Sequence, residues 1–305
     1  MIDKITYSAP AKVILSGEHA VVYGNPALVS AVNLRLKFTI LERPLQNSKL
    51  NKEVLFISQK VKDFLNIKKI IFEDKQFSYK IESEIPVGRG LGSSAALSVA
   101  SVAAFLEFYT GRKFDKKVIN KLAFQIEKHF HSNPSGVDNS ASCFGGLILY
   151  QKQKSLKNLD YKIPKNIEEK LFLIDGGKPE ETTGDMVKSV ESVESVETIL
   201  IKIEIETKKI LDSIENVKID LFKESIINNE KLLEELGVVS EVTKTLLKDL
   251  LKFGVGKVTG AGGRKSGSGF ILFYAEDEEK LIKCLITKKI LFYRLITDDI
   301  GLIRH

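Results

Sequence analysis

Three glycines that lead directly into two serines and a run of small residues constrain this chain more than any other feature. The stretch is PVGRGLGSSAAL, residues 86–97. Glycine allows tight turns and lets a ligand approach the backbone closely. We expect Ser93 or Ser94 to cap the helix that follows. A helix start presents free N–H groups and the positive end of the helix dipole, so the segment predicts a loop that binds phosphate groups.

Two familiar nucleotide-binding loops do not fit this stretch. No Lys follows the two serines, so it is not the GxxxxGK[ST] loop. No acidic residue stands where a dinucleotide-binding βαβ unit needs one. A glycine turn that merely starts a helix remains the alternative interpretation of this segment taken alone.

Size and charge limit the class of protein. With 305 residues, 43% of them hydrophobic, the chain can form one large core or two domains that share a cleft. The net charge of +6 suits anionic substrates, and because the basic residues are spread along the chain, nucleic acid is not expected as the main partner. Cys143, Cys284, His129 and His131 lack the spacing of a metal site or a disulfide framework. Without a signal-peptide pattern or an apolar run of about 20 residues, a cytoplasmic protein without a membrane partner is expected.

Hydrophobic periodicity predicts alternating strands and helices in the first half. Residues 4–40 are strand-rich around a turn at Gly17–His19. Further strands are predicted at 77–85 and 145–150, helices at 51–64, 93–109 and 115–129, and a turn at 131–140.

The second half begins after a polar, Lys-rich stretch at residues 151–170, which predicts an irregular boundary between domains 1–165 and 166–305. A strand is expected at 171–174, mostly helix at 181–253, and strand–helix–strand from residue 270. The repeat SVESVESVE at 189–197 favours one face of a helix, whereas the isoleucines at 201, 203 and 205 alternate with charges as in a strand, and this choice stays open. The order of elements predicts an α+β protein with two layers and a cleft between them.

Polar residues outside the loop each have an ordinary explanation when taken alone. Lys12 lies in an apolar strand, and its amine could reach water from an edge position. Glu18 and His19 follow in a glycine turn, where polar side chains are commonly exposed. Glu127 on a helix could be a surface charge, and Asp138 in a turn could hydrogen-bond its own backbone.

Considered together, these residues supply the parts that phosphoryl transfer needs. Mg²⁺ takes oxygen ligands and keeps several waters, so one Ser hydroxyl and one carboxylate are sufficient. A second carboxylate can accept the proton of an attacking hydroxyl, and a lysine can stabilise the developing negative charge. The combination favours a phosphoryl-transfer enzyme.

Five motifs resemble the GHMP kinase superfamily, and within it the mevalonate kinase family. APAKVILSGEHAVVYG (9–24) resembles the family's Lys-bearing first strand and GEHAV turn. PVGRGLGSSAA (86–96) resembles its phosphate loop, and KVTGAGG (257–263) resembles its C-terminal glycine motif. HSNPSGVDNS (131–140) resembles the substrate loop of mevalonate kinases, and GKPEETTGDMV (177–187) the start of their C-terminal domain.

This resemblance implies a fold and an activity. The fold would be the two-domain α+β GHMP kinase fold, with an N-terminal ribosomal-protein-S5-like nucleotide domain, a C-terminal ferredoxin-like α/β sandwich and the active site in the cleft. The activity would be transfer of the ATP γ-phosphoryl group to the 5-hydroxyl of (R)-mevalonate, with ATP and Mg²⁺ as cofactors, in isoprenoid biosynthesis. Alternatives are another GHMP small-molecule kinase, such as phosphomevalonate kinase or homoserine kinase, and a catalytically silent binding protein. Small molecules are the expected partners, with a possible homodimer.

Carried over position by position, the resemblance also implies roles. Asp138 would be the catalytic base, with Lys12 as its partner at the transferred phosphoryl group. Ser94 and Glu127 would hold Mg²⁺. The residues expected to bind the substrate are Glu18, His19 and Thr183, and those expected to bind the ATP phosphates are Gly88, Arg89, Gly90, Leu91, Gly92, Ser93, Ser94 and Ala95.

Several positions depart from the family's pattern. Arg89 stands where a small residue is usual, and Ser132 stands where Gly is usual. The C-terminal motif continues with Arg264 and Lys265 in place of further glycines. We expect these two side chains to project into solvent, because the family's loop leaves little room beside the nucleotide.

Overall fold

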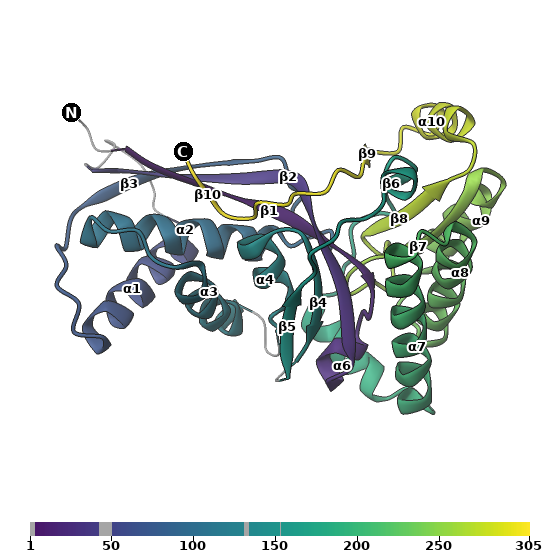
Figure 1. Cartoon of the computed structure of the whole chain (residues 1–305), viewed down its shortest axis with the longest axis horizontal. Helices are drawn as coiled ribbons and strands as arrows, with labels where there is room; N and C mark the ends of the chain where they lie inside the picture. The colour runs from purple at the N-terminus through teal and green to yellow at the C-terminus, as the bar shows by residue number, and fades with distance from the viewer. Residues whose placement is uncertain (1–3, 43–50, 131–133, 153) are drawn as a thin grey trace.

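The computed structural model describes residues 4–42, 51–130, 134–152 and 154–305. Its described strands form two sheets, which lie toward opposite ends of an elongated molecule in Figure 1. His131 and Ser132 of the predicted turn lie outside the described residues. The two-layer α+β architecture predicted from the order of elements is confirmed.

The first sheet is built on a long hairpin. Strands β1 (Lys4–Ser16) and β2 (Pro26–Glu42) are joined through the predicted Gly17–His19 turn and a short 3-10 helix, η1 (Ala20–Tyr23). The order is β10-β1-β2-β4-β5, and β3 also pairs with β2. The remaining members are β3 (Phe77–Ser83), β4 (Leu147–Gln151), β5 (Ser155–Asn158) and β10 (Ile303–Arg304).

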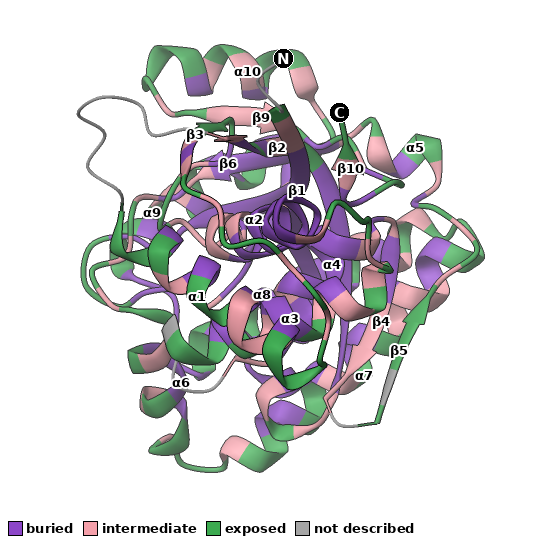
Figure 2. Cartoon of the chain, turned by 90° about the vertical axis from the view of Figure 1, so that its left-hand side faces the viewer, coloured by how far each residue is buried: buried purple, intermediate pink, exposed green. Residues whose placement is uncertain are grey.

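Helices cover one face of this sheet, and α2 (Ser93–Thr110) is the central one, as the buried colour in Figure 2 shows. Its Ala and Ser side chains are small enough to let β1, β2 and neighbouring helices approach closely. Its neighbours are α1 (Lys52–Ile67), α3 (Lys116–Phe130) and α4 (Val137–Phe144). By length and composition α2 could cross a membrane, the one described helix of which this is true, but 72% of it is buried inside the fold. That burial makes α2 the core helix of this layer.

The second sheet has the order β7-β8-β6-β9, with every neighbouring pair antiparallel. Its strands are β6 (Leu171–Asp175), β7 (Gly254–Val258), β8 (Phe270–Ala275) and β9 (Phe292–Arg294). Helices lie between β6 and β7 in the chain, and α10 (Glu278–Thr287) lies between β8 and β9. This split β-α-β arrangement is the predicted ferredoxin-like sandwich.

The helical segment between β6 and β7 resolves the choice that the sequence left open. It contains α6 (Thr183–Glu191), α7 (Val196–Glu215), α8 (Ile219–Glu235) and α9 (Glu241–Leu250), followed by η2 (Leu251–Phe253). Residues 201–205 are helical, with Ile203 buried and Ile201 and Ile205 exposed. Ile203 lies in the same hydrophobic cluster as Leu232 and Leu233 of α8, so this stretch has one buried face, as an amphipathic helix does.

Three local predictions were wrong. The repeat at 189–197 spans the break between α6 and α7, where Ser192 donates to the Ser189 carbonyl oxygen at 2.8 Å and competes with the helix. The predicted turn at 131–140 becomes the helix α4 from Val137 onward. The stretch at 151–170 contains β5, which extends the sheet beside β4, and the short helix α5 (Lys165–Glu168).

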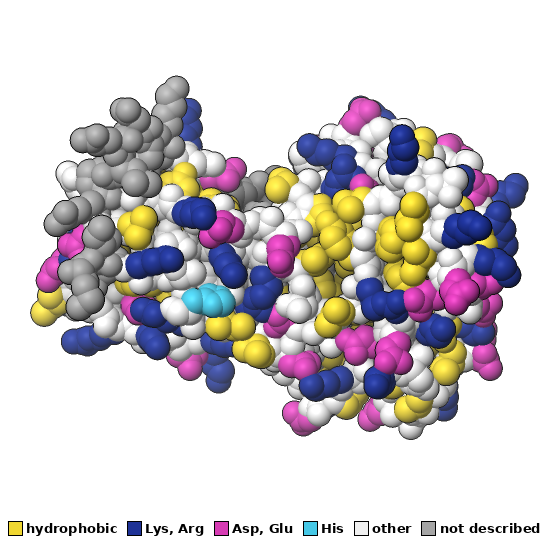
Figure 3. Space-filling view, turned by 90° about the horizontal axis from the view of Figure 1, so that it is seen from above, with side chains coloured by type: hydrophobic (Ala, Val, Ile, Leu, Met, Phe, Trp, Pro, Cys, Tyr) yellow, Lys and Arg dark blue, Asp and Glu magenta, His cyan; other side chains and the backbone are white. Residues whose placement is uncertain are grey.

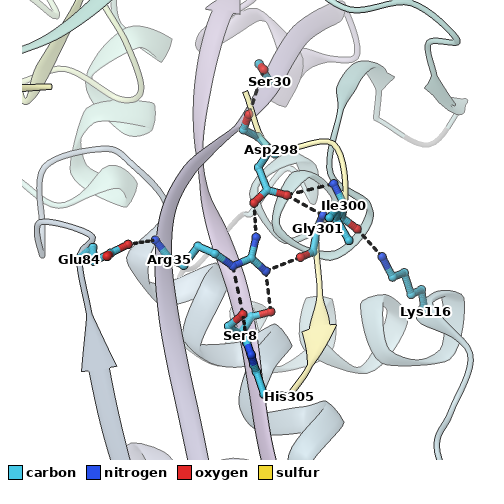
Figure 4. A network of polar contacts seen from close by, with 10 residues as sticks. Ser8, Ser30, Arg35, Glu84, Lys116, Asp298, Ile300, Gly301 and His305 are labelled. Atoms are coloured by element: carbon cyan, nitrogen blue, oxygen red, sulfur yellow. Dashed lines mark hydrogen bonds and ion pairs between the residues drawn. The ribbon is translucent and has the colours of Figure 1, made fainter. Parts of the chain in front are cut away.

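The end of the chain returns to the first sheet (Figure 4). Strand β10 pairs with β1, with Arg304 opposite Tyr7. Arg35 on β2 forms an ion pair with Asp298, and its guanidinium also donates to the Ser8 hydroxyl at 3.0 Å. These contacts fasten residues 298–305 across both strands of the central hairpin. The predicted domain 166–305 includes β10, yet β10 belongs to the first sheet. The boundary between residues 165 and 166 therefore stays a prediction.

Figure 3 looks down on the upper side of the molecule in Figure 1 and shows Lys and Arg side chains interspersed with Asp and Glu. Hydrophobic side chains gather on its right-hand part. The exposed apolar residues of the chain from α10 to β10 are Ile286, Leu291, Ile296 and Ile300. Because positive and negative side chains are interspersed on this face, the positive net charge is not concentrated there.

Candidate active site

A cavity of about 570 Å³ lies where segments of the two sheets meet. The glycine loop, residues 134–139 and Lys12 contribute from the first sheet and its helices. Residues 178–191 and the glycine motif at 260–262 contribute from the second. The motifs identified in the sequence therefore contribute to the lining of one shared cavity.

The glycine loop adopts a backbone that favours glycine. Gly88, Gly90 and Gly92 have φ of 71°, 87° and 76°, in the left-handed region. A Cβ on Gly92 would lie 2.9 Å from Cγ of Lys12, so a side chain here would displace that lysine. Gly92 is also the N-cap of α2, and it makes no side-chain capping bond. The expected cap by Ser93 or Ser94 was therefore wrong: Ser94 donates elsewhere, and the amides of the first turn stay available to a ligand.

Lys12 and Asp138 form an ion pair on the cavity wall, with Nζ 3.2 Å from Oδ1. The Lys12 side chain is 3% exposed and that of Asp138 is 40% exposed, so the carboxylate is the accessible member. The Lys12 backbone N–H donates to the Leu91 carbonyl oxygen at 3.0 Å, which fixes β1 against the glycine loop. Asp138 lies in the first turn of α4, whose positive dipole end stabilises a negative charge.

Glu127 on α3 faces the same cavity and is held by two hydroxyls. Ser94 Oγ donates to Glu127 Oε1 at 3.0 Å, and Ser98 Oγ donates to the same oxygen at 2.8 Å. Among the described residues, no group of three or more His, Cys, Asp or Glu side chains could hold a metal. One hydroxyl and one carboxylate fit Mg²⁺ rather than a metal that needs a full protein cage, because Mg²⁺ retains water and substrate oxygens as ligands.

His19 and Thr183 also line the cavity. His19 Nε2 lies 3.0 Å from the Ala261 carbonyl oxygen. Because a carbonyl can only accept, Nε2 carries the proton and Nδ1 keeps a lone pair. Burial lowers the pKa of His19 to about 4, so the imidazole is neutral at neutral pH.

Glu18 does not line the cavity in the structure. Its carboxylate forms a fully buried ion pair with Lys257 of β7, and Lys257 Nζ also donates to the Val258 carbonyl oxygen at 2.8 Å. Burial raises the pKa of Glu18, and the positive charge of Lys257 opposes that rise. The role of Glu18 toward a substrate stays a prediction. Lys257 was missed because a lysine at the head of a glycine motif gives no signal of burial.

Glu230 of α8 completes this buried cluster and provides a prediction. Burial raises the pKa of Glu230 from 4.5 to about 7, while Oε2 accepts from the Val258 N–H at 2.7 Å. The folded state therefore keeps a proton that the unfolded state releases between about pH 4.5 and 7. We expect the free energy of unfolding to fall as pH rises through that window, by up to about 3 kcal/mol.

Glu230→Gln removes this titration. The melting temperature of the variant should therefore rise relative to that of the parent chain as the pH increases from 5 to 8. Thermal unfolding of both proteins at several pH values measures the difference. A difference that stays constant with pH would contradict a protonated Glu230 in the folded state.

Arg89 and Leu91 are the two loop residues that the structure does not bring to the cavity. The Arg89 guanidinium pairs with Asp175 at the end of β6, and its carbonyl oxygen accepts from the Phe270 N–H at 3.2 Å. Leu91 is buried in the core. Arg89 thus ties the glycine loop to the second sheet, and a phosphate contact for it stays a prediction. Arg264 and Lys265 are exposed and lie outside the cavity lining, as predicted.

Comparisons with known proteins agree with this geometry. The model of the GHMP kinase N-terminal domain matches residues 56–146. The mevalonate kinase of Archaeoglobus fulgidus is 34% identical over 286 residues, covering 88% of this chain and 92% of the relative. The mevalonate kinase of Thermococcus gammatolerans is 31% identical, with 93% of each chain covered.

Solved structures give the same result. The crystal structure of Methanococcus jannaschii mevalonate kinase superposes with a TM-score of 0.79 at 25% identity, covering 97% of this chain and 98% of that one. L. major mevalonate kinase in complex with R-mevalonate has a TM-score of 0.76 at 19% identity, with 96% and 95% covered, and at that identity it supports the fold alone. The extent of the sequence match and the cavity built from the same motifs lead to one conclusion: the chain belongs to the mevalonate kinase family of the GHMP kinases.

Proposed function

We propose that this chain transfers the γ-phosphoryl group of ATP to the 5-hydroxyl of (R)-mevalonate, forming 5-phosphomevalonate and ADP. The observation that carries the proposal is the Lys12–Asp138 ion pair, which lines the same cavity as the glycine loop. An accessible carboxylate with a cation beside it, next to a loop of free amides, is the arrangement that transfer to an alcohol requires.

In the proposed step, an oxygen of Asp138 accepts the proton of the 5-hydroxyl as that oxygen bonds to the γ-phosphorus. The bond between this phosphorus and the β–γ bridging oxygen breaks, and ADP leaves with the electron pair. Lys12 provides positive charge near the transferred group, while the amides at the start of α2 bind the phosphates. The chain therefore supplies a base, a cation and a phosphate site.

We also propose that Ser94 and Glu127 hold Mg²⁺ together with the ATP phosphates. When bound, this ion neutralises negative charge on the phosphates. Ser98 donates a second hydrogen bond to Glu127 Oε1 and so orients the carboxylate. Thr183 and His19 contribute polar groups to the substrate end of the cavity.

Some expectations stay predictions. They are the division into domains 1–165 and 166–305, cytoplasmic location and the possible homodimer. The expectation that the chain has neither a nucleic-acid partner nor a membrane partner also stays a prediction.

The proposed substrate is tested by ADP release from ATP with mevalonate, phosphomevalonate, homoserine and galactose as acceptors. Mevalonate should be phosphorylated with a kcat/KM well above that of the other three, because the chain belongs to the mevalonate kinase family and its loop at 131–140 resembles that family's substrate loop. Equal or higher activity on phosphomevalonate or homoserine would reassign the chain to another branch of the superfamily. No ADP release with any acceptor, in folded protein, would favour the silent binding protein.

A further inference from the structure

The glycine loop packs directly against backbone that belongs to the second sheet and its connections. A Cβ on Gly90 would lie 3.1 Å from the Thr259 carbonyl oxygen, and a Cβ on Gly269 would lie 2.8 Å from the Arg89 carbonyl oxygen. That Arg89 oxygen also accepts from the Phe270 N–H at 3.2 Å. Because Gly90 and Gly269 both line the cavity, a shift at this contact moves the wall that is proposed to bind the phosphates.

The Arg89 side chain strengthens this contact with a charge. Its guanidinium forms an ion pair with the carboxylate of Asp175, at the end of β6. The Arg89 side chain is 29% exposed and that of Asp175 is 14% exposed, so water screens this pair less than it screens a pair on the open surface. Neither residue is among the cavity-lining residues, so the pair acts on the loop from outside the cavity.

Asp175 is a fixed partner for Arg89, because its other carboxylate oxygen is also bonded. Asp175 Oδ1 accepts from the Gly177 N–H at 3.0 Å. The Gly177 carbonyl oxygen in turn accepts from the Gly269 N–H at 2.8 Å, and the Gly176 N–H donates to the Gly269 carbonyl oxygen at 2.8 Å. The carboxylate is therefore held by the same backbone segment that packs against the loop.

A loop with three glycines needs such an anchor if it is to bind a ligand tightly. Glycine has more backbone freedom than any other residue, and that freedom is lost when a ligand fixes the loop. A contact that holds the loop in its bound conformation beforehand removes part of this cost and increases affinity. Arg89 stands where the family usually has a small residue, so this anchor is a feature of this chain.

We propose that the Arg89–Asp175 ion pair holds the glycine loop in the position that binds ATP, which makes both residues positioning residues for phosphoryl transfer. This inference rests on the proposed function, because it names what places the loop that receives the phosphates. The loop amides contact ATP, whereas Arg89 acts on ATP through the loop. A direct bond from Arg89 to a phosphate is the competing interpretation, and the first test separates the two.

The first test is ATP binding to Asp175→Asn, measured by calorimetry without an acceptor. Asn keeps a side-chain oxygen for the Gly177 N–H and loses the charge that pairs with Arg89. The ATP dissociation constant should rise about fivefold or more, while kcat at saturating ATP stays within about threefold of the parent. An unchanged or lower dissociation constant would overturn the proposal, because an Arg89 that binds phosphate directly is freed by this substitution.

The matched control is Asp249→Asn, which removes the partner of Lys288 at residues that do not line the cavity. It should leave the ATP dissociation constant unchanged. Thermal unfolding of both variants identifies a purely structural pair: a lower melting temperature of Asp175→Asn, with ATP affinity within twofold of the parent, would also overturn the proposal.

The second test is a double-mutant cycle with Arg89→Gln. If the two residues act as one pair, the double variant should bind ATP within twofold of Asp175→Asn, and losses that multiply would overturn the proposal. Arg89→Lys should retain most of the affinity, since it keeps the positive charge. Failure of the proposed function is a separate result, because a parent chain that binds ATP but does not phosphorylate mevalonate would contradict the acceptor and leave the ATP measurements intact.

Discussion

Asp138→Asn is expected to lower kcat by at least about a hundredfold. General base catalysis contributes a factor of about 10²–10⁴, and Asn cannot accept the proton of the 5-hydroxyl. Its side-chain oxygen still offers Lys12 a hydrogen-bond acceptor at the position that Asp138 Oδ1 occupies 3.2 Å from Nζ. We therefore expect the ATP dissociation constant and the melting temperature to change little.

The control for this variant is Asp220→Asn, because the Asp220 side chain is 98% exposed and is not among the cavity-lining residues. It should leave kcat unchanged. Single-turnover kinetics, ATP titration and thermal unfolding of both variants separate chemistry from folding. Near-normal turnover by folded Asp138→Asn would remove Asp138 as the base, and loss of activity only through unfolding would indicate a structural role.

Glu127→Gln is expected to raise the free Mg²⁺ concentration for half-maximal rate by about tenfold or more. Gln keeps the size of the side chain and can still accept from Ser94 and Ser98 through one oxygen, so the fold should stay intact. The lost negative charge is the one that a hard divalent cation requires. The rate at saturating ATP, measured against free Mg²⁺, gives the effect.

High Mg²⁺ should rescue Glu127→Gln and should not rescue Asp138→Asn, which distinguishes the two carboxylates. Circular dichroism checks the fold of each variant. An unchanged Mg²⁺ dependence in Glu127→Gln would mean that this carboxylate only holds the two serines.

Local chemistry made parts of the site predictable from the sequence. The glycine loop was found because Gly88, Gly90 and Gly92 are needed wherever the backbone takes positive φ before a helix. The strands and most helices followed from periodicity. The pairing of Lys12 with Asp138 joins distant positions, and no local pattern implies it; it came from the resemblance of the motifs around them.

Other features depend on tertiary structure and left no local signal. The Ser94 hydroxyl could hydrogen-bond either to the backbone at the start of α2 or to Glu127. It donates to Glu127, because α3 places that carboxylate beside it. Whether Glu18 faces a ligand or Lys257 depends on where β7 lies, and β7 is brought in from the other end of the chain. The turn and repeat predictions were wrong for the same reason, since neither turn-forming residues nor valines spaced three apart determine where a helix begins or ends.

The return of residues 298–305 to β1 has a consequence for biosynthesis. Strands β1 and β2 leave the ribosome well before residues 298–305, which follow about 15 to 60 seconds later at 5–20 residues per second. During that interval Arg35 lacks Asp298, Ser8 lacks the imidazole of His305, and the edge of β1 has no β10 beside it. A nascent chain therefore presents an open strand edge, which invites pairing with other chains. Once residues 298–305 have emerged, β10 closes that edge and joins β1 and β2 in one sheet.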